Sequence, residues 1–181
     1  MMQVTGRTVQ AMKRTRFDCM PCPLARALEH LSDSWNVLIL REAFFGARRF
    51  DDFASKLEIP SNTLTARLKS LVAGGILERR QYHERPPRFE YVLTEKGRDL
   101  RPVLLTLFAW GTKYDPPPHV TVRLVDQTTG KAVDQLALID AQTGKRIGTD
   151  HVVVRTSAAK GTPRTNTYPF PETYSPEVSS T

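Results

Sequence analysis

Apolar residues recur at helical spacing in three stretches of the first 60 residues, and each stretch predicts one helix. The first is expected to begin at Pro23, because a proline lacks a backbone donor that the first turn leaves unsatisfied anyway. The second opens near Ser34 and ends at Gly46, and the third runs from about Arg49 to Leu57. The side chains expected to face a core are Leu24, Ala27, Leu28, Leu31, Trp35, Leu38, Ile39, Ala43, Phe50, Phe53 and Leu57.

A fourth helix follows the tight connection at residues 58–60 and is expected to start with Ser61 as its N-cap. Gly74 and Gly75 end it, because glycine adopts the left-handed conformation of a helix C-terminus at low cost. A short helix, a tight turn and a second helix in this order are typical of a helix-turn-helix. The buried face of the fourth helix is expected to consist of Leu64, Leu68 and Leu71.

Two strand-like runs come next, at 76–82 and 88–93. The connection between them contains two consecutive prolines, which cannot sit inside a sheet ladder and therefore predict an exposed hairpin loop. Thr94 then caps a last helix that runs to about Lys113, and Pro102 is expected to kink it. The fold class predicted is α+β, mainly α: a winged helix-turn-helix with a C-terminal dimerisation helix, followed by a small antiparallel β unit.

The segment after Asp115 differs in composition and contains an internal repeat. The pattern Leu-Val-Asp…Thr-Gly-Lys at 124–131 recurs 14 residues later as Leu-Ile-Asp…Thr-Gly-Lys at 138–145. An Asp followed by Thr-Gly between β-type residues favours hairpin turns. The predicted organisation is a flexible basic arm (1–17), the winged domain (18–114), a proline-rich linker (115–118), a small β-hairpin repeat unit (119–155) and a disordered tail (156–181).

The net charge of +7 is confined to the first part of the chain. Residues 1–114 contain 19 Lys and Arg against 12 Asp and Glu, whereas residues 115–181 contain seven of each. A basic excess on one module favours a polyanionic partner, although a merely soluble basic surface explains it as well.

The outward face of the fourth helix is polar and almost free of acids, which suits contacts with base edges and phosphates. Arg67 lies at the flank of this face, where we expect a phosphate contact. Arg85 and Arg88 flank the tip of the hairpin loop and are expected to contact the minor groove or the backbone; a solvated hairpin with salt bridges to Glu84 and Glu90 is the alternative. The candidate DNA-binding residues are Ser61, Asn62, Thr63, Thr65, Ala66, Arg67, Lys69, Ser70, Arg85 and Arg88.

Residues 19–113 resemble the HxlR family of winged-helix regulators, relatives of the MarR group. One departure is Asp33-Ser34, where the family usually has Gly and Lys. The matching residues include Cys22-Pro23, Arg26-Ala27-Leu28, Trp35, Leu38 to Glu42, Gly46, Arg49-Phe50, Ser61, Leu64, Arg67 to Lys69, Leu71, Gly74 to Arg79, Pro86 to Arg88, Glu90-Tyr91, Leu93-Thr94 and Gly97.

The resemblance implies a homodimer on a two-fold double-stranded DNA operator, acting as a repressor. Helix 61–73 would enter the major groove, and the wing at 83–88 would contact the minor groove or backbone. The last helix supports a dimer independently, because its apolar surface is broader than one small core needs; burial against the 119–155 unit is the alternative. The expected interface residues are Leu100, Val103, Leu104, Leu107, Phe108 and Trp110.

Cys22 is a candidate sensor of oxidants or electrophiles. It is expected at a helix N-terminus with Arg26 one turn on, and both features lower the pKa of a thiol. Some HxlR relatives sense such compounds through a cysteine near this position, but a buried structural cysteine is the simpler alternative. A zinc site formed with Cys19 lacks a second pair of ligands.

No catalytic grouping, phosphate loop or metal pair is visible, so we expect neither an enzyme nor a bound cofactor or metal. His83 has no partner at metal-binding spacing and is expected to be a wing surface residue. No apolar run approaches a membrane span, and the simplest location is the cytoplasm. Two alternatives stay open: a winged helix that binds protein instead of DNA, and regulation by an unknown small-molecule or redox effector.

Overall fold

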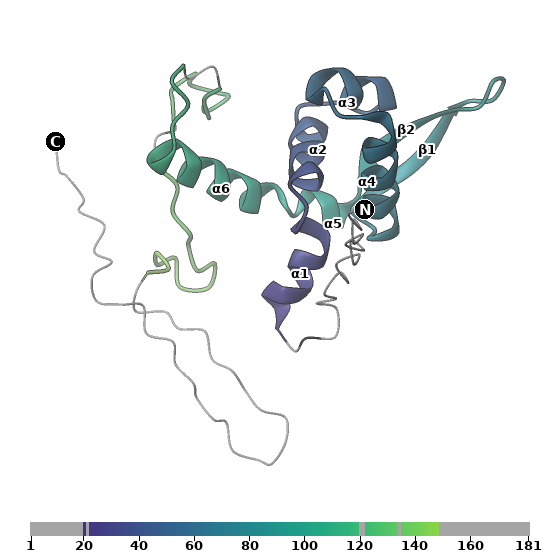
Figure 1. The fold of residues 1–181 in the computed structure, drawn as a ribbon. Coiled ribbons are helices and arrows are strands. Elements are labelled where there is room, and N and C mark those ends of the chain that lie inside the picture. Colours follow the sequence, from purple (N-terminus) through teal and green to yellow (C-terminus); the bar gives the residue numbers. More distant parts are fainter. Residues whose placement is uncertain (1–19, 21, 120–121, 134, 149–181) are drawn as a thin grey trace, which may run out of the picture. The chain divides into compact units, whose positions relative to one another are not determined.

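The computed structural model describes residues 20, 22–119, 122–133 and 135–148. The basic arm predicted for 1–17 and the tail predicted for 156–181 lie outside the described residues. The chain divides into two compact units, Met1–Gly111 and Thr112–Thr181. Along the chain the elements are α1 (Pro23–Leu31), α2 (Ser34–Phe44), α3 (Phe50–Leu57), α4 (Ser61–Ala73), β1 (Leu77–His83), β2 (Arg88–Leu93), α5 (Glu95–Arg98) and α6 (Arg101–Tyr114) (Figure 1).

Helices and one antiparallel hairpin make up the first unit, which confirms the mainly α architecture of a winged helix-turn-helix. Its core lies between α2, α3, α4 and the start of β1. Partly buried apolar side chains, such as Trp35 of α2 and Phe50 of α3, pack against it. The buried apolar residues of the core are Ile39, Leu40, Ala47, Phe53, Ile59, Leu64, Leu68, Leu71, Ile76 and Leu77.

The interior of α2 differs from the sequence-based prediction in two ways. Leu40 is completely buried, whereas Leu38, which was expected to face inward, is only half-buried. Asn36 and Glu42 are buried although both are polar. Glu42 is compensated by pairing with Arg41 at 2.7 Å. The side-chain nitrogen of Asn36 donates to the His30 carbonyl at 2.8 Å, whereas its Oδ1 has no hydrogen-bond partner within the described residues.

The expected burial of α1 is largely wrong. The helix has no buried residue, and Leu24 and Leu28 keep 69% and 42% of their surface exposed. Leu31 at its end is partly buried against the core. The helix therefore forms as predicted, but most of its apolar face is not covered within the described chain.

Helix α4 begins and ends differently from a simple capped helix. Pro60 holds the N-cap position and Ser61 is already the first helical residue, so the expectation of a Ser61 cap is wrong. A proline with φ −57° and extended ψ is already shaped for a helix start. At the other end, Gly75 takes φ +66° and donates to Val72, while Ile76 donates to Leu71. This pair of bonds is the Schellman closure, which explains Gly75. Gly74 has φ −75°, so the left-handed conformation predicted for both glycines is found only at Gly75.

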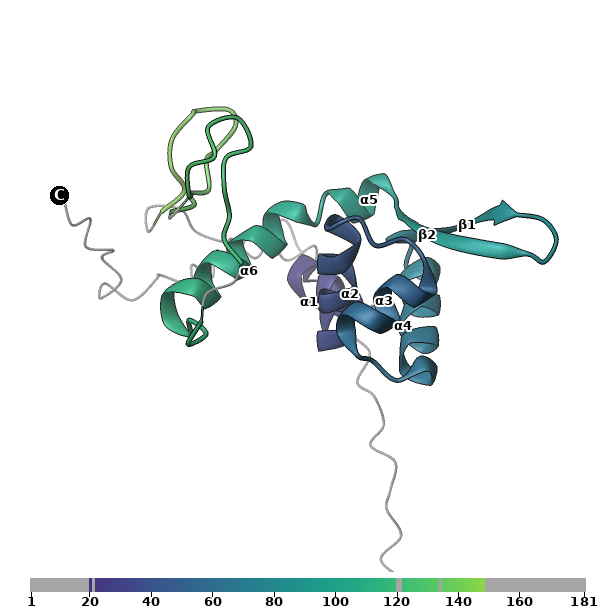
Figure 2. The same cartoon turned by 90° about the horizontal axis from the view of Figure 1, so that it is seen from above.

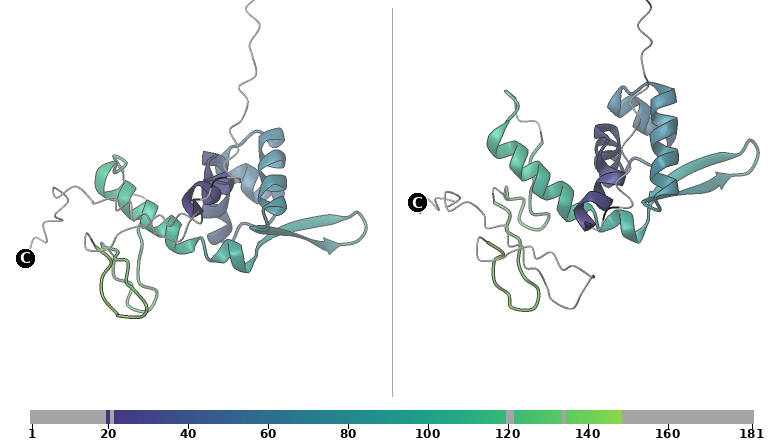
Figure 3. Two further views of the ribbon diagram at one scale, coloured as in Figure 1. Left: turned by 90° about the horizontal axis from the view of Figure 1, so that it is seen from below. Right: turned by 60° about the horizontal axis from the view of Figure 1, so that its bottom comes forward.

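Strands β1 and β2 form a two-stranded antiparallel sheet with Leu77 opposite Leu93 and a register shift between Gln81 and His83. The hairpin projects away from the helices (Figures 2 and 3). Its base is held by the segment before α3, because Tyr91 donates to the Arg48 carbonyl at 2.7 Å. Both predicted strands are confirmed to within one residue.

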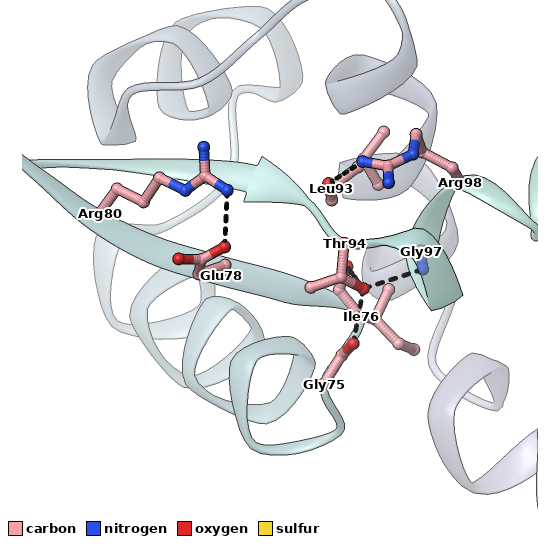
Figure 4. Close-up of polar contacts among 8 residues, drawn as sticks. All are labelled: Gly75, Ile76, Glu78, Arg80, Leu93, Thr94, Gly97 and Arg98. Atoms are coloured by element: carbon pink, nitrogen blue, oxygen red, sulfur yellow. Dashed lines mark hydrogen bonds and ion pairs between the residues drawn. The ribbon is translucent and has the colours of Figure 1, made fainter.

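Thr94 fastens the end of the hairpin to the end of α4 (Figure 4). Its hydroxyl lies 2.7 Å from the Gly75 carbonyl and accepts the Gly97 amide at 3.1 Å, which confirms Thr94 as the cap of the next helix. Gly97 is buried here, and a Cβ atom at this position would collide with the Ile76 carbonyl oxygen. Glycine is therefore required by close approach of two backbones.

The predicted kink at Pro102 is instead a complete break. Helix α5 ends at Arg98 and α6 starts at Arg101, so Pro102 occupies the first turn of a new helix. A proline inside a continuous helix would collide with the carbonyl four residues earlier. Interrupting the helix at residues 99–100 removes that collision.

Two similar turns are described in the second unit. In the first, three backbone amides donate to backbone carbonyls: that of Asp126 to Lys131, that of Gly130 to Asp126, and that of Val133 to Leu124. The same three bonds recur 14 residues later, and each turn contains one glycine at φ +68°. Each turn is closed by a single antiparallel bridge, so the described residues show the repeat as turns but show no strands of a β unit.

Candidate nucleic-acid interface

The exposed face of α4 is polar and contains no acid. Because Leu64, Leu68 and Leu71 are buried, the helix is fixed with the opposite side outward. Of the predicted DNA-binding residues on α4, Thr63 and Arg67 are half-buried. The fully exposed ones are Ser61, Asn62, Thr65, Ala66, Lys69 and Ser70.

Thr65 is partly committed to the helix itself. Its hydroxyl donates to the Ser61 carbonyl at 2.8 Å, one turn earlier. The bond fixes the direction of the hydroxyl and leaves its oxygen available to accept a further donor. Thr65 therefore offers an acceptor to a ligand, whereas Asn62 offers both a donor and an acceptor.

Arg67 does not extend to the solvent. Its Nη2 lies 2.7 Å from Asp33 Oδ2, and its side chain keeps 28% of its surface exposed. In this arrangement the charge predicted to meet a phosphate is already paired within the domain.

The tip of the wing carries two accessible arginines. Arg85 and Arg88 are exposed, and neither forms an ion pair within the described part of the chain. The loop between the strands is ordered locally by His83, whose Nδ1 lies 3.0 Å from the Pro86 carbonyl oxygen. His83 is an exposed wing residue, in line with its expected place.

Sequence reasoning missed three further arginines at the wing. Arg79 lies over the Phe89 ring at 3.4 Å from its centroid, and Arg49 lies 4.8 Å from the centroid of Tyr82. Arg80 pairs with Glu78 at 2.8 Å, and this hydrogen bond lowers the pKa of the Glu78 carboxyl (Figure 4). The alternation of basic and aromatic residues along the two strands was the signal available in the sequence.

The start of α3 is held by a carboxylate. Asp52 accepts the backbone amides of Arg49 at 2.9 Å and Arg48 at 3.2 Å, and these two bonds lower its pKa. The charged group thereby satisfies amides that the first turn leaves free. It also fixes the Arg48-Arg49 segment beside β2, next to the base of the wing.

The C-terminal end of α4 is clamped by residues from α1 and α5. Lys96 donates to the Gly74 carbonyl at 2.8 Å, and its Nζ lies 3.3 Å from His30 Nε2. Burial, reinforced by the nearby Lys96 charge, lowers the pKa of His30. A neutral imidazole is the form that can lie beside the ammonium group.

The predicted interface residues of the last helix fall into two groups. Leu100 and Leu104 pack against the core of the first unit. By contrast, Val103, Leu107 and Trp110 expose 52%, 53% and 59% of their surface. Phe108 is half-buried. The dimer contact itself stays a prediction, and its strongest members are the three exposed side chains.

Cys22 holds the N-cap position of α1 and is half-buried, with its carbonyl accepting the Arg26 amide at 3.1 Å. Its place at a helix N-terminus is as expected. Cys19 lies outside the described residues, so the idea of a zinc site with Cys22 has no geometry to test it. A sensing role for Cys22 stays a prediction.

The fold and the exposed polar face of α4 define a winged helix-turn-helix regulator. Residues 30–119 match the family model described as HxlR-like helix-turn-helix. Rv3095 of Mycobacterium tuberculosis, an uncharacterized HTH-type transcriptional regulator, is 46% identical over 112 residues, which cover 61% of this chain and 71% of that protein. The chain belongs to the HxlR-like helix-turn-helix family, which consists of transcriptional regulators and not of enzymes.

Two solved structures are similar to this chain over more than the winged domain. PA1607, described as a candidate transcription factor, is 35% identical with a TM-score of 0.70, covering 79% of this chain and 100% of that chain. PA1374 from Pseudomonas aeruginosa, described in the same way, is 40% identical with a TM-score of 0.56, covering 77% and 95%. Both shares exceed the fraction of the chain that the winged domain occupies.

None of the described helices combines the length and the apolar character that crossing a bilayer requires.

Proposed function

We propose that the protein represses transcription as a homodimer bound to a two-fold DNA operator. In each protomer α4 enters the major groove and the wing tip contacts the minor groove or the phosphate backbone. The observation that carries the proposal is the exposed face of α4, which is polar and free of acids from Ser61 to Ser70. Such a face can approach base edges without repelling the phosphates on either side.

The residues of the interface divide by role. Asn62, Thr65 and Ser70 carry short side chains with donors and acceptors, which suit the reading of base edges. Lys69, Arg85 and Arg88 carry exposed charges, which suit phosphates and add affinity without sequence preference. Helix α4, the wing loop and β2 thus supply both kinds of exposed side chain.

A homodimer is supported by the apolar side chains that the described chain leaves uncovered. Val103, Leu107 and Trp110 project from one helix, and each exposes more than half of its surface. Leu24 and Leu28 of α1 are further exposed apolar residues. Burying large apolar side chains against a second copy is the commonest way to remove them from water.

The function is tested with DNA recovered from the native genome by the full-length protein. Sequencing that DNA gives the operator, and the dissociation constant for it is then measured at several salt concentrations. We expect Lys69→Gln to weaken binding and to reduce the slope of log K against log salt by about 1.8, because the dimer loses one phosphate contact in each protomer and each contact contributes about 0.9. Lys145→Gln, which removes the same charge from an exposed turn of the second unit, is the matched control and should change neither value.

The same titration separates DNA binding from the alternative of a protein-interaction module. A module that binds protein would recover no consistent DNA sequence, and its affinity for DNA would be equal for operator and random fragments. Equal effects of Lys69→Gln and Lys145→Gln would contradict the placement of α4 in the groove.

A further inference from the structure

The ion pair between Asp33 and Arg67 joins the start of α2 to the middle of α4. Arg67 Nη2 lies 2.7 Å from Asp33 Oδ2, and the two side chains keep only 28% and 25% of their surface exposed. Dissolved salt screens a partly buried ion pair less than it screens an ion pair on the surface. The contact therefore constrains α4 relative to α2 more than a surface salt bridge would.

Asp33 is itself held in place from the other side. Its Oδ1 accepts the Trp35 amide at 3.0 Å as the cap of α2, and its backbone carbonyl accepts the Asn36 amide at 3.0 Å. The Trp35 side chain packs against the core. Because the carboxylate is fixed by the first turn of α2, it is the flexible Arg67 side chain that takes its direction from Asp33.

A second observation shows the direction of the Arg67 guanidinium. Its Nε atom is buried, and within the described residues it has no hydrogen-bond partner. The Arg67 Nε–H group could form a hydrogen bond with water if the side chain extended into the solvent, but it is held inside the domain. A reach toward a phosphate would break the 2.7 Å contact and leave the half-buried Asp33 carboxylate unpaired.

We infer that Arg67 is a positioning residue that, together with Asp33, fixes the rotation of α4 about its own axis, and that it does not neutralise a phosphate. Rotation matters because neighbouring positions on a helix differ by about 100°, so a small turn redirects every outward side chain. The inference rests on the proposed function. It replaces the phosphate contact expected for Arg67 from its sequence position.

The test uses Asp33→Asn, Arg67→Met and the double variant in the full-length protein, each assayed on the recovered operator and on random DNA over a range of salt. We expect each single variant to weaken operator binding at least tenfold while random-DNA binding changes less than twofold. The salt slope should stay that of the wild type. The double variant should bind the operator no more weakly than the single variant with the lower affinity. Arg123→Met, an exposed arginine of the second unit, controls for the lost charge.

Opposite signs for the two single variants would overturn the inference. If Arg67 contacts a phosphate in each protomer, Arg67→Met lowers the salt slope by about 1.8, whereas Asp33→Asn frees the arginine, removes a nearby acid and tightens binding. Equal loss of operator and random-DNA binding would also overturn it, because it would indicate a damaged fold. A wild-type protein that recovers no operator would instead contradict the proposed function, so the two failures are distinct.

Discussion

Helices α4 and α6 are nearly equal in length, with 13 and 14 residues, yet they bury their apolar side chains very differently. Helix α4 has three fully buried leucines, whereas α6 has no buried residue at all. Both sequences are rich in leucine, so composition does not explain the difference. It arises from what each helix faces: α4 closes the core of its own domain, whereas α6 packs Leu104 against that core and leaves Val103, Leu107, Trp110 and Tyr114 more than half exposed.

The comparison shows that the number of apolar residues in a helix indicates how much of its surface has to be buried. It does not indicate which partner surface buries it. The buried face of α4 fixes its polar face toward the solvent, where a nucleic acid can be read. On α6, by contrast, Val103 and Leu107 each keep more than half of their surface exposed. The orientation of α4 is determined by the core of its own domain, whereas that of α6 depends on the surface that it contacts.

The largest contrast is expected on removing one leucine from each helix. Leu68→Ala, at a site with no exposed surface, should lower the free energy of unfolding by about 2 to 5 kcal/mol because it leaves a cavity. Chemical denaturation measures this. Leu107→Ala is the matched variant in α6, and at low protein concentration it should change the unfolding free energy by less than about 0.5 kcal/mol. Equal losses would show that α6 is buried within its own chain.

Self-association should respond in the reverse order. Leu107→Asp removes from each protomer one exposed leucine that the proposed dimer would bury, and it should weaken the dimer by about 3 kcal/mol, roughly a hundredfold in dissociation constant. Sedimentation equilibrium over a range of concentrations measures it. Lys56→Gln on α3 serves as a charge control, since Lys56 is exposed and its replacement also makes each protomer more negative by one unit of charge. A wild-type protein that stays monomeric at all concentrations would remove the dimer from the proposal.

The connection between the two helices passes through Gly97, and its sequence should be sensitive there. Gly97→Ala places a methyl group against the Ile76 carbonyl and should cost about 1 to 3 kcal/mol of unfolding free energy. Gly111→Ala is the matched control in α6, where an added Cβ meets no atom within 4 Å. It should stabilise the helix by about 0.5 to 1 kcal/mol. Thermal unfolding of both variants shows whether the loss at Gly97 comes from the steric contact with Ile76 or from replacing any glycine.

The smallest effect concerns the clamp at the end of α4 and depends on pH. The pKa of His30 is lowered in the folded protein, so the unfolded chain binds the proton more readily. Stability from this group is therefore complete above about pH 6.5 and is lost as the pH falls below that value toward the folded pKa. A plot of unfolding free energy against pH for wild type and His30→Gln should differ in slope only in this acidic range. Parallel curves would show that His30 titrates as it does in the unfolded chain.

The elements of the winged domain could be predicted because local patterns determine them. Leucine spacing placed α4, the proline pair placed the wing loop, and Thr94 placed the following helix start. These signals depend on residues at most a few positions apart. The order of the elements then indicated the class of fold.

The features that the sequence did not reveal depend on contacts between distant residues. Arg67 was expected at a phosphate because its helical position is at the flank, but its partner Asp33 lies on another helix. The exposure of Leu24 and the complete burial of Leu40 likewise depend on which helix packs against which. Periodicity indicates that a helix has an apolar and a polar face. Tertiary packing determines which residues of other elements each face contacts. The DNA contacts themselves stay predictions.

The two turns of the second unit have a consequence for how the chain can vary in length. All three backbone bonds that close each turn lie within a single 14-residue copy, so neither turn depends on the other for its hydrogen bonds. Adding or deleting one complete copy would leave no backbone group of the remaining turn without its partner. The segment can therefore be lengthened or shortened in whole copies, whereas a change of a few residues would interrupt a turn.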